Sequence, residues 1–154
     1  MTTPEERIAR LGLELPDVVA PLASYVPAVR TGSLVYTSGQ VPFVKGEPIA
    51  TGKVGAEVTL EQAQEAARVC ALNAIAALKA EVGELSRVVR IVKVVGFVAS
   101  APDFVDQPQV VNGASDLLGE VFGEAGRHAR SAVGVAVLPR DVPVEVELIA
   151  EIGA

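Results

Sequence analysis

Residues 131–152 read SAVGVAVLPRDVPVEVELIAEI, and this stretch limits the kinds of sheet that the chain can form. Its two apolar runs, Ser131–Leu138 and Val144–Ile152, predict two strands, because Val and Ile are enriched in strands. The segment 139–143 between them begins and ends with proline, which cannot continue a hydrogen-bonded ladder. In the second run, apolar residues alternate with acidic ones from Glu145 onward, as in a strand with one buried face. The chain therefore ends in a sheet that has one face against a core.

Three more strands and a long helix are predicted upstream of this stretch. The strands are Val26–Arg30, Leu34–Ser38 and Val88–Ser100, and the helix is Leu60–Val82. Thr59 and Gln62 form a capping box ahead of the helix, and Gly83 is a natural stop. Small residues at steps of three and four along this helix allow it to pack closely.

Two further helices have start signals of their own. One opens at Asp106 and Pro108, carries an apolar stripe and is expected to end at Gly126. A short one is predicted at the N-terminus, where Thr3 and Glu6 form a capping box.

The order of the main elements, β-β-α-β-α-β-β, predicts one α+β domain over residues 1–154. This length fits a single domain at a prior of about 150 residues each. We expect a mixed β-sheet with two helices on one face. No element is left to cover the other face, so we expect self-association to bury it.

The composition argues against several classes of function. A net charge of −6 disfavours contact with a phosphate backbone, so no nucleic-acid partner is expected. No apolar run approaches the roughly 20 residues of a membrane span, so no membrane partner is expected either. A single histidine, His128, and a single cysteine, Cys70, are too few for a His/Cys zinc site. One cysteine cannot form an internal disulfide, which favours a cytoplasmic location.

Two stretches carry a resemblance to a known family. They are Tyr36-Thr37-Ser38-Gly39-Gln40-Val41-Pro42 and residues 129–147, ARSAVGVAVLPRDVPVEVE. They resemble the signature stretches of the RidA family, which is also called YjgF or endoribonuclease L-PSP. The resemblance covers about residues 25–152, and residues 1–24 form an N-terminal extension like that of one subgroup. The Gly-Pro that precedes the family's tyrosine is Ala23-Ser24 here, and the cysteine two residues after its arginine is Ala132.

The resemblance implies a chorismate mutase-like fold and a homotrimer with clefts between its subunits. It also implies an activity, the hydrolysis of reactive 2-imino acids to 2-oxo acids and ammonia. This enamine/imine deaminase chemistry would need no cofactor and no metal. The ligand would be a small carboxylate or imino acid.

The resemblance also implies roles for six residues. Arg130 would bind the carboxylate of the substrate, and Glu145 would place the attacking water. The rest of the cleft would be lined by Tyr25, Ser38, Gly39 and Asn112.

The residue types fit these roles, but each has a simpler structural alternative. A guanidinium such as that of Arg130 can hold a carboxylate through two hydrogen bonds, or it can form a surface salt bridge. Glu145 can orient water, or it can belong to a solvated acidic face. Tyr25 can stack on a flat imine or pack at an interface. We expect Cys70 to be buried and inert, and His128 to be exposed.

The distance between the two main residues sets a further condition. If the last two strands form a hairpin that turns near Asp141, Arg130 lies about seven residues from the level of Glu145, roughly 20 Å along the strand. Either Glu145 is then structural, or the site joins Arg130 of one subunit to Glu145 of another.

Two other functions stay open from the sequence. A non-catalytic protein could use the same cleft to bind a small carboxylate. RNA cleavage, which the older family label implies, is disfavoured by the charge of −6.

Overall fold

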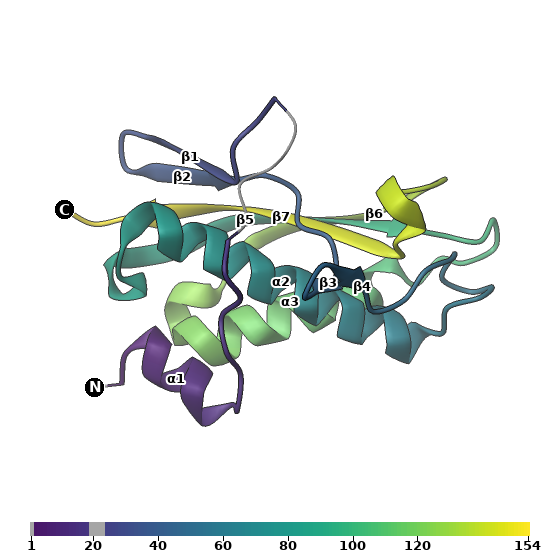
Figure 1. Cartoon of the computed structure of the whole chain (residues 1–154), viewed down its shortest axis with the longest axis horizontal. Coiled ribbons are helices and arrows are strands. Elements are labelled where there is room, and N and C mark those ends of the chain that lie inside the picture. The colour runs from purple at the N-terminus through teal and green to yellow at the C-terminus, as the bar shows by residue number, and fades with distance from the viewer. Residues whose placement is uncertain (1, 19–23) are drawn as a thin grey trace.

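The structure is a computed structural model that describes residues 2–18 and 24–154 (Figure 1). Its five main strands are β1 Ala28–Thr31, β2 Leu34–Thr37, β5 Val88–Ala99, β6 Ala129–Val135 and β7 Val144–Ile152. Its helices are α1 Pro4–Arg10, α2 Leu60–Val82 and α3 Gln107–Phe122. The main strands form one mixed sheet in the order β1-β2-β7-β5-β6. Two short strands, β3 Phe43–Val44 and β4 Glu47–Pro48, pair separately.

The bounds of α2 and β7 agree with the prediction, whereas the end of α3 differs. α3 ends at Phe122, because Gly123 takes a φ of 63° and donates its N–H to the Gly119 carbonyl. Gly126, the predicted end, instead closes the 3-10 turn that follows. After its short helix, the extension contains no helix or strand at residues 13–18 and 24, and Ala23 lies outside the described residues.

β5 lies in the middle of the sheet and separates the last two strands of the chain. It pairs in parallel with β6 and antiparallel with β7. The hairpin considered above, turning near Asp141, is therefore wrong. Residues Pro139–Asp141 form a 3-10 turn, after which the Pro143 carbonyl accepts a hydrogen bond from the Ala99 N–H at the end of β5. Both edges of the long apolar strand β5 are therefore hydrogen-bonded to neighbouring strands.

Helices α2 and α3 cover one face of the sheet, as predicted (Figure 1). Two glycines allow this layer to lie close to its neighbours. A Cβ on Gly96 of β5 would overlap the Val111 side chain of α3. A Cβ on Gly113 of α3 would overlap the Gln64 carbonyl of α2. The position of α3 over the sheet therefore depends on the lack of a side chain at both of these glycines.

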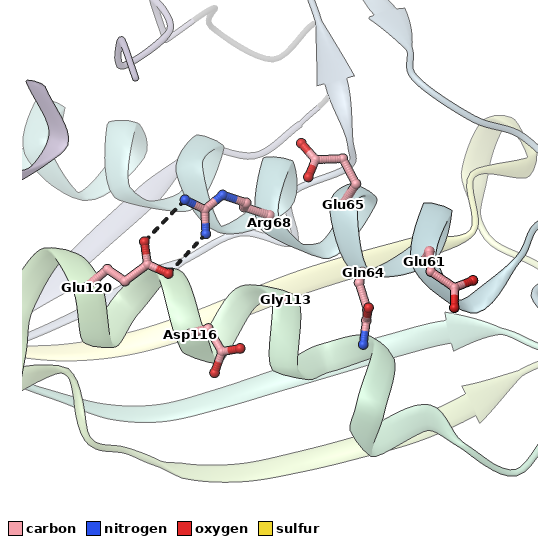
Figure 2. Close-up of a pocket in the computed structure, with 7 residues that line it drawn as sticks. All are labelled: Glu61, Gln64, Glu65, Arg68, Gly113, Asp116 and Glu120. Carbon is pink, nitrogen blue, oxygen red and sulfur yellow. Dashed lines mark hydrogen bonds and ion pairs between the residues drawn. The ribbon is translucent and has the colours of Figure 1, made fainter. Parts of the chain in front are cut away.

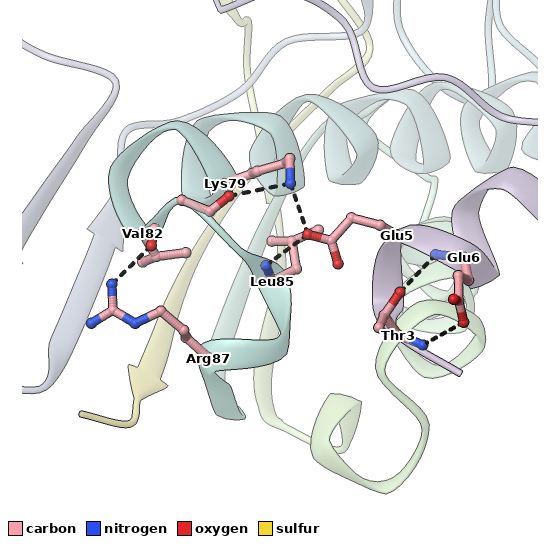
Figure 3. A network of polar contacts seen from close by, with 8 residues as sticks. Thr3, Glu5, Glu6, Lys79, Val82, Leu85 and Arg87 are labelled. Atoms are coloured by element: carbon pink, nitrogen blue, oxygen red, sulfur yellow. Dashed lines mark hydrogen bonds and ion pairs between the residues drawn. The ribbon is translucent and has the colours of Figure 1, made fainter. Parts of the chain in front are cut away.

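Helix α1 packs beside α3 and begins with the predicted capping box of Thr3 and Glu6 (Figure 3). Its Glu5 carboxylate accepts hydrogen bonds from Lys79 Nζ at 2.7 Å and from the Leu85 N–H at 2.9 Å. Burial acts to raise the pKa of Glu5, but these hydrogen bonds outweigh it and lower that pKa. The extension is thus tied to the end of α2 by an ionised carboxylate.

The other face of the sheet has no helix over it among the described residues (Figure 1). Val29, Tyr36 and Val133 lie on this face and are 52%, 43% and 43% exposed. Such exposed apolar side chains on one side of a sheet are typical of a surface that associates with another protein. No helix among the described residues is long and apolar enough to cross a membrane.

Candidate functional site

Arg130 projects from the edge strand β6 toward the helices. Its register partner on β5 is Val94, whose fully buried side chain faces the helix layer. The guanidinium reaches the first turns of α3, where Nη1 donates to Asn112 Oδ1 at 2.7 Å and to Ser115 Oγ at 3.2 Å. Nη2 donates to the Pro108 carbonyl at 3.3 Å. The structure therefore brings Asn112 and Arg130 together, at the junction of α3 and β6.

These three bonds leave one edge of the guanidinium open. An arginine has five N–H groups, and the bonds use both of those on Nη1 and one on Nη2. Within residues 2–18 and 24–154, the Nε–H and the second Nη2–H have no acceptor, and no carboxylate forms an ion pair with Arg130. Two neighbouring N–H groups of a guanidinium can hold a carboxylate through two parallel hydrogen bonds.

A histidine is linked to this guanidinium through Ser115. His128 Nε2 lies 2.9 Å from Ser115 Oγ, and its Nδ1 lies 2.6 Å from the Gly126 carbonyl. The prediction that His128 is exposed is wrong, because the ring is half-buried between α3 and the turn after it. Burial and the charge of Arg130 lower the pKa of His128, although the bond to Gly126 acts in the opposite direction. The lowered pKa favours the neutral form of the ring at pH 7.

Glu145 belongs to a second group of residues, on the uncovered face. Its register partner on β5 is Phe97, which alternates with the buried residues of that strand. The carboxylate lies so close to Gly39 that a Cβ there would overlap Oε2. Burial, and to a lesser extent the charge of Glu147, raise the pKa of Glu145. Gly39, which was predicted to line the cleft, thus has this carboxylate as its neighbour.

Ser38 and Tyr25 lie next to the same group. The Ser38 hydroxyl donates to the Val26 carbonyl at 2.5 Å, and the Ser38 N–H donates to the Pro27 carbonyl at 2.8 Å. The hydroxyl of Ser38 thus holds the segment that carries Tyr25, instead of pointing an unused donor at a ligand. The Tyr25 side chain is 57% exposed.

The two groups do not meet within one chain. Arg130 faces the helices and Glu145 faces the uncovered side, with β5 between their strands and three residues (94 to 97) between their register partners. Their Cα atoms are about 14 Å apart, given strands spaced by about 4.8 Å and a rise of about 3.3 Å per residue. One small substrate cannot contact both side chains in one subunit, so the assignments of all six residues stay predictions.

Sequence reasoning missed Ser115 and underrated His128. Ser115 follows Asn112 by three residues, a spacing that places both on one face of a helix. That spacing could have indicated a shared contact. The Pro108 and Gly126 carbonyls could not be found this way, because a backbone acceptor has no sequence signal.

A groove between α2 and α3 lies apart from both groups (Figure 2). Its volume is about 280 Å³, and acidic side chains dominate its lining. Its cation, Arg68, is held by Glu120 through two bonds of 3.3 and 3.2 Å. None of the six predicted site residues lines it, and its neutralised cation makes it unsuited to an anionic ligand.

Comparison with known proteins places this geometry in context. The profile of a family described as "YjgF/chorismate_mutase-like, putative endoribonuclease" matches residues 5–152. Protein TCP17 of Trypanosoma cruzi is 47% identical over 146 residues, which is 94% of this chain and 91% of that protein. A RutC family protein of Haemophilus influenzae is 37% identical over 131 residues, covering 85% of this chain and 88% of its own length.

Solved structures show the same fold. Atu1372 of Agrobacterium tumefaciens, a protein of unknown function, has a TM-score of 0.91 and 46% identity over 99% of this chain and 93% of its own. Escherichia coli TdcF with bound serine has a TM-score of 0.61 and 29% identity over 87% of this chain and 92% of its own.

Proposed function

The chain belongs to the YjgF/chorismate mutase-like family, and from this premise we propose that it hydrolyses reactive 2-imino acids to 2-oxo acids and ammonia. The match to the family model and the similarity to a solved structure confirm the family and the chorismate mutase-like α+β fold that were expected from the sequence motifs. The reaction, the site residues and the trimer belong to the proposal.

The observation that carries the proposal is the open edge of Arg130. Its Nε–H and free Nη2–H form a fork for one carboxylate, and no acid among the described residues competes for it. A charge-assisted pair of this kind binds a carboxylate with a defined orientation. Bound serine in TdcF supports a small molecule bearing a carboxylate as the ligand class.

The chemistry then needs a water and a group that can take its proton. Water adds to the carbon of the C=N bond, and its proton passes to Glu145, whose pKa burial raises toward the range of a general base. The carbinolamine takes that proton on nitrogen. Its C–N bond then breaks while the proton of its hydroxyl group passes back to the Glu145 carboxylate, which leaves ammonia and the 2-oxo acid. Imines hydrolyse readily in water, so positioning by Arg130 and Glu145 accounts for the barrier that remains.

The site needs more than one subunit in this proposal. Arg130 and Glu145 face opposite sides of one sheet, while the uncovered face exposes Val29, Tyr36 and Val133. Association of that face with the β6 edge of a neighbouring subunit in a homotrimer would place Glu145 of one subunit near Arg130 of the next. The same clefts would bring Tyr25 toward the ligand.

An assay with an imine made in situ by an amino-acid oxidase tests the proposal. We expect the protein to accelerate imine loss and Arg130→Ala to abolish the acceleration. Arg127→Ala is the matched control, because Arg127 is an exposed cation whose ion pair is with Glu124. No acceleration by the wild type, or an unchanged rate in Arg130→Ala, rejects the proposal. Binding of 2-oxo acids with no turnover would instead identify a carboxylate-binding protein.

RNA cleavage is a separate outcome of the same preparation. The net charge of −6 and the lack of a platform of basic and aromatic residues in the sequence argue against it. RNA degradation that falls with Arg130→Ala would favour it over imine hydrolysis.

A further inference from the structure

We propose that Ser115 and His128 are positioning residues that fix the Arg130 guanidinium for its ligand. The carboxylate as ligand rests on the proposed function, whereas the relay itself rests on geometry alone. The relay is a chain of three hydrogen bonds that runs from the Gly126 carbonyl through His128 and Ser115 to Arg130.

The direction of each bond in this chain follows from its ends. The Gly126 carbonyl can only accept, so His128 Nδ1 carries the hydrogen across 2.6 Å. In the neutral ring Nε2 is then an acceptor, and the Ser115 hydroxyl donates to it across 2.9 Å. This leaves the lone pairs of Ser115 Oγ to accept from Arg130 Nη1 at 3.2 Å. The donor and the acceptor of each of the three hydrogen bonds are thereby assigned.

The starting point of the relay is rigid. Gly126 is buried in the turn that follows α3, and a Cβ there would overlap the Leu118 carbonyl. The turn is therefore packed on the helix that carries Ser115. The guanidinium is located by α3 and its following turn, with Asn112 holding the same Nη1 from the previous turn of the helix.

The relay works only with a neutral imidazole. An imidazolium would donate to Ser115 Oγ from Nε2, so two cations would donate to one hydroxyl oxygen, and the hydrogen of that hydroxyl would lose His128 as its acceptor. The charged group that faces the ring is Arg130 on β6, while α3 offers it the Ser115 hydroxyl and the turn offers a carbonyl. The nearby Arg127–Glu124 pair is solvent-exposed, with side chains 81% and 92% accessible. Burial and the charge of Arg130 both keep the pKa of His128 low, which agrees with the neutral role.

The relay is tested first by nitrogen NMR on the wild-type protein at pH 8. We expect His128 in the Nδ1–H tautomer and a resolved Arg130 Nε–H signal. Arg130→Gln removes the neighbouring charge, so the pKa of His128 should rise in that variant. The Nε2–H tautomer, or a ring already protonated at pH 7, would overturn the proposal.

Variants of Ser115 then test the consequence for the ligand. Ser115→Ala should raise Kd for 2-oxobutanoate and KM for the imine by about 2- to 13-fold, the range that corresponds to the net contribution of one hydrogen bond. It should change kcat less and shift the Arg130 Nε–H signal. Ser115→Thr keeps the hydroxyl and should restore wild-type values, and Arg127→Ala should alter none of them.

The outcomes separate the relay from the proposed function. An unchanged Kd and an unchanged Arg130 signal in Ser115→Ala would refute the relay. If the wild type neither binds 2-oxobutanoate nor hydrolyses an imine, the proposed function fails, and the tautomer and the Arg130 signal still decide the relay. If Ser115→Ala fails to fold, the wild-type tautomer and Ser115→Thr carry the decision.

Discussion

Arg130 differs from an ordinary surface cation because three hydrogen bonds to α3 fix the orientation of its guanidinium. Asn112 and Ser115 accept from Nη1 and the Pro108 carbonyl accepts from Nη2, so the Nε–H and one Nη2–H have no acceptor among the described residues. A planar fork held in this way recognises a carboxylate by shape as well as by charge.

This orientation predicts that a point charge is a poor substitute. Arg130→Lys should weaken 2-oxobutanoate binding by about 10- to 100-fold, because an ammonium cannot form the two parallel bonds, each worth about 1.5–3 kcal/mol at most. Isothermal titration calorimetry measures the change, with Arg127→Lys as control. Equal affinity in Arg130→Lys would mean that charge alone is recognised.

Glu145 should make stability depend on pH in the direction opposite to most carboxylates. Burial raises its folded-state pKa, so the fold favours its protonated form. Its contribution is most favourable below the unfolded pKa and is lost as pH rises through the raised folded pKa. Glu145→Gln lacks this loss. When the pH is raised from 4 to 7, the change in Tm should therefore be more favourable in Glu145→Gln than in the wild type. The exposed Glu14→Gln provides the control, and identical Tm profiles for Glu145→Gln and wild type would contradict the assignment.

At the scale of elements, an ionised carboxylate adds to the attachment of α1, beside its buried Ile8 and the Arg7 bond to the Val121 carbonyl. Hydrogen bonds from Lys79 and Leu85 lower the folded pKa of Glu5 despite burial. This stabilisation is present above the unfolded pKa and is lost as pH falls through the lowered folded value.

Glu5→Gln should therefore destabilise the protein at pH 7 by about 1 kcal/mol, a figure reduced for the partial exposure of the pair. The difference from wild type should disappear in strong acid. Urea unfolding at pH 7 and pH 3 measures both values, again with Glu14→Gln as control. A difference that persists unchanged at pH 3 would show that the charge of Glu5 is not what attaches the helix.

The spacing between α3 and the sheet is a second property of elements. Gly96 admits the Val111 side chain, and Val111 is the neighbour of Asn112 in the chain. A methyl group at position 96 would push α3 outward and separate Asn112 from Arg130.

Gly96→Ala should cost about 1–3 kcal/mol, the range for overpacking a core contact, and should also weaken ligand binding. Gly119→Ala is a matched control on α3, because its Cβ would meet nothing within 4 Å. That change should stabilise the helix by about 0.5–1 kcal/mol. Thermal unfolding compares the two, and a neutral effect of Gly96→Ala would show that the layer can adjust.

At the scale of the whole molecule, a site that used both groups of predicted residues would need a second subunit. Arg130 and Glu145 lie on opposite faces of one sheet, and neither can cross β5 to reach the other. A site that uses both must combine the helix side of one subunit with the uncovered side of another.

Mixing two inactive variants tests this arrangement. Co-expressed Arg130→Ala and Glu145→Gln chains should regain about a quarter of wild-type activity, because in a closed ring about one interface in four unites the two intact residues. Each variant alone should stay inactive, and sedimentation velocity should give a trimer. A monomer, or a mixture without activity, would contradict a shared site.

Local patterns in the sequence were sufficient for most of the fold. The capping boxes at Thr3 and Thr59, and the alternation after Val144, predicted elements that are present because these signals act over one or two turns. The end of α3 was misplaced, since Gly123 and Gly126 are both possible stops and only packing distinguishes them.

The pairing of strands and the surroundings of the site residues were decided only in three dimensions. The sequence indicated Arg130 and Asn112 as candidates, but it could not show that β5 would separate the last two strands or that His128 would support Arg130 through Ser115. Such contacts join residues far apart in the chain and depend on backbone carbonyls, register and the facing of each strand. Residue patterns determine local conformation, whereas the long-range packing of the sheet and helices determines which side chains meet.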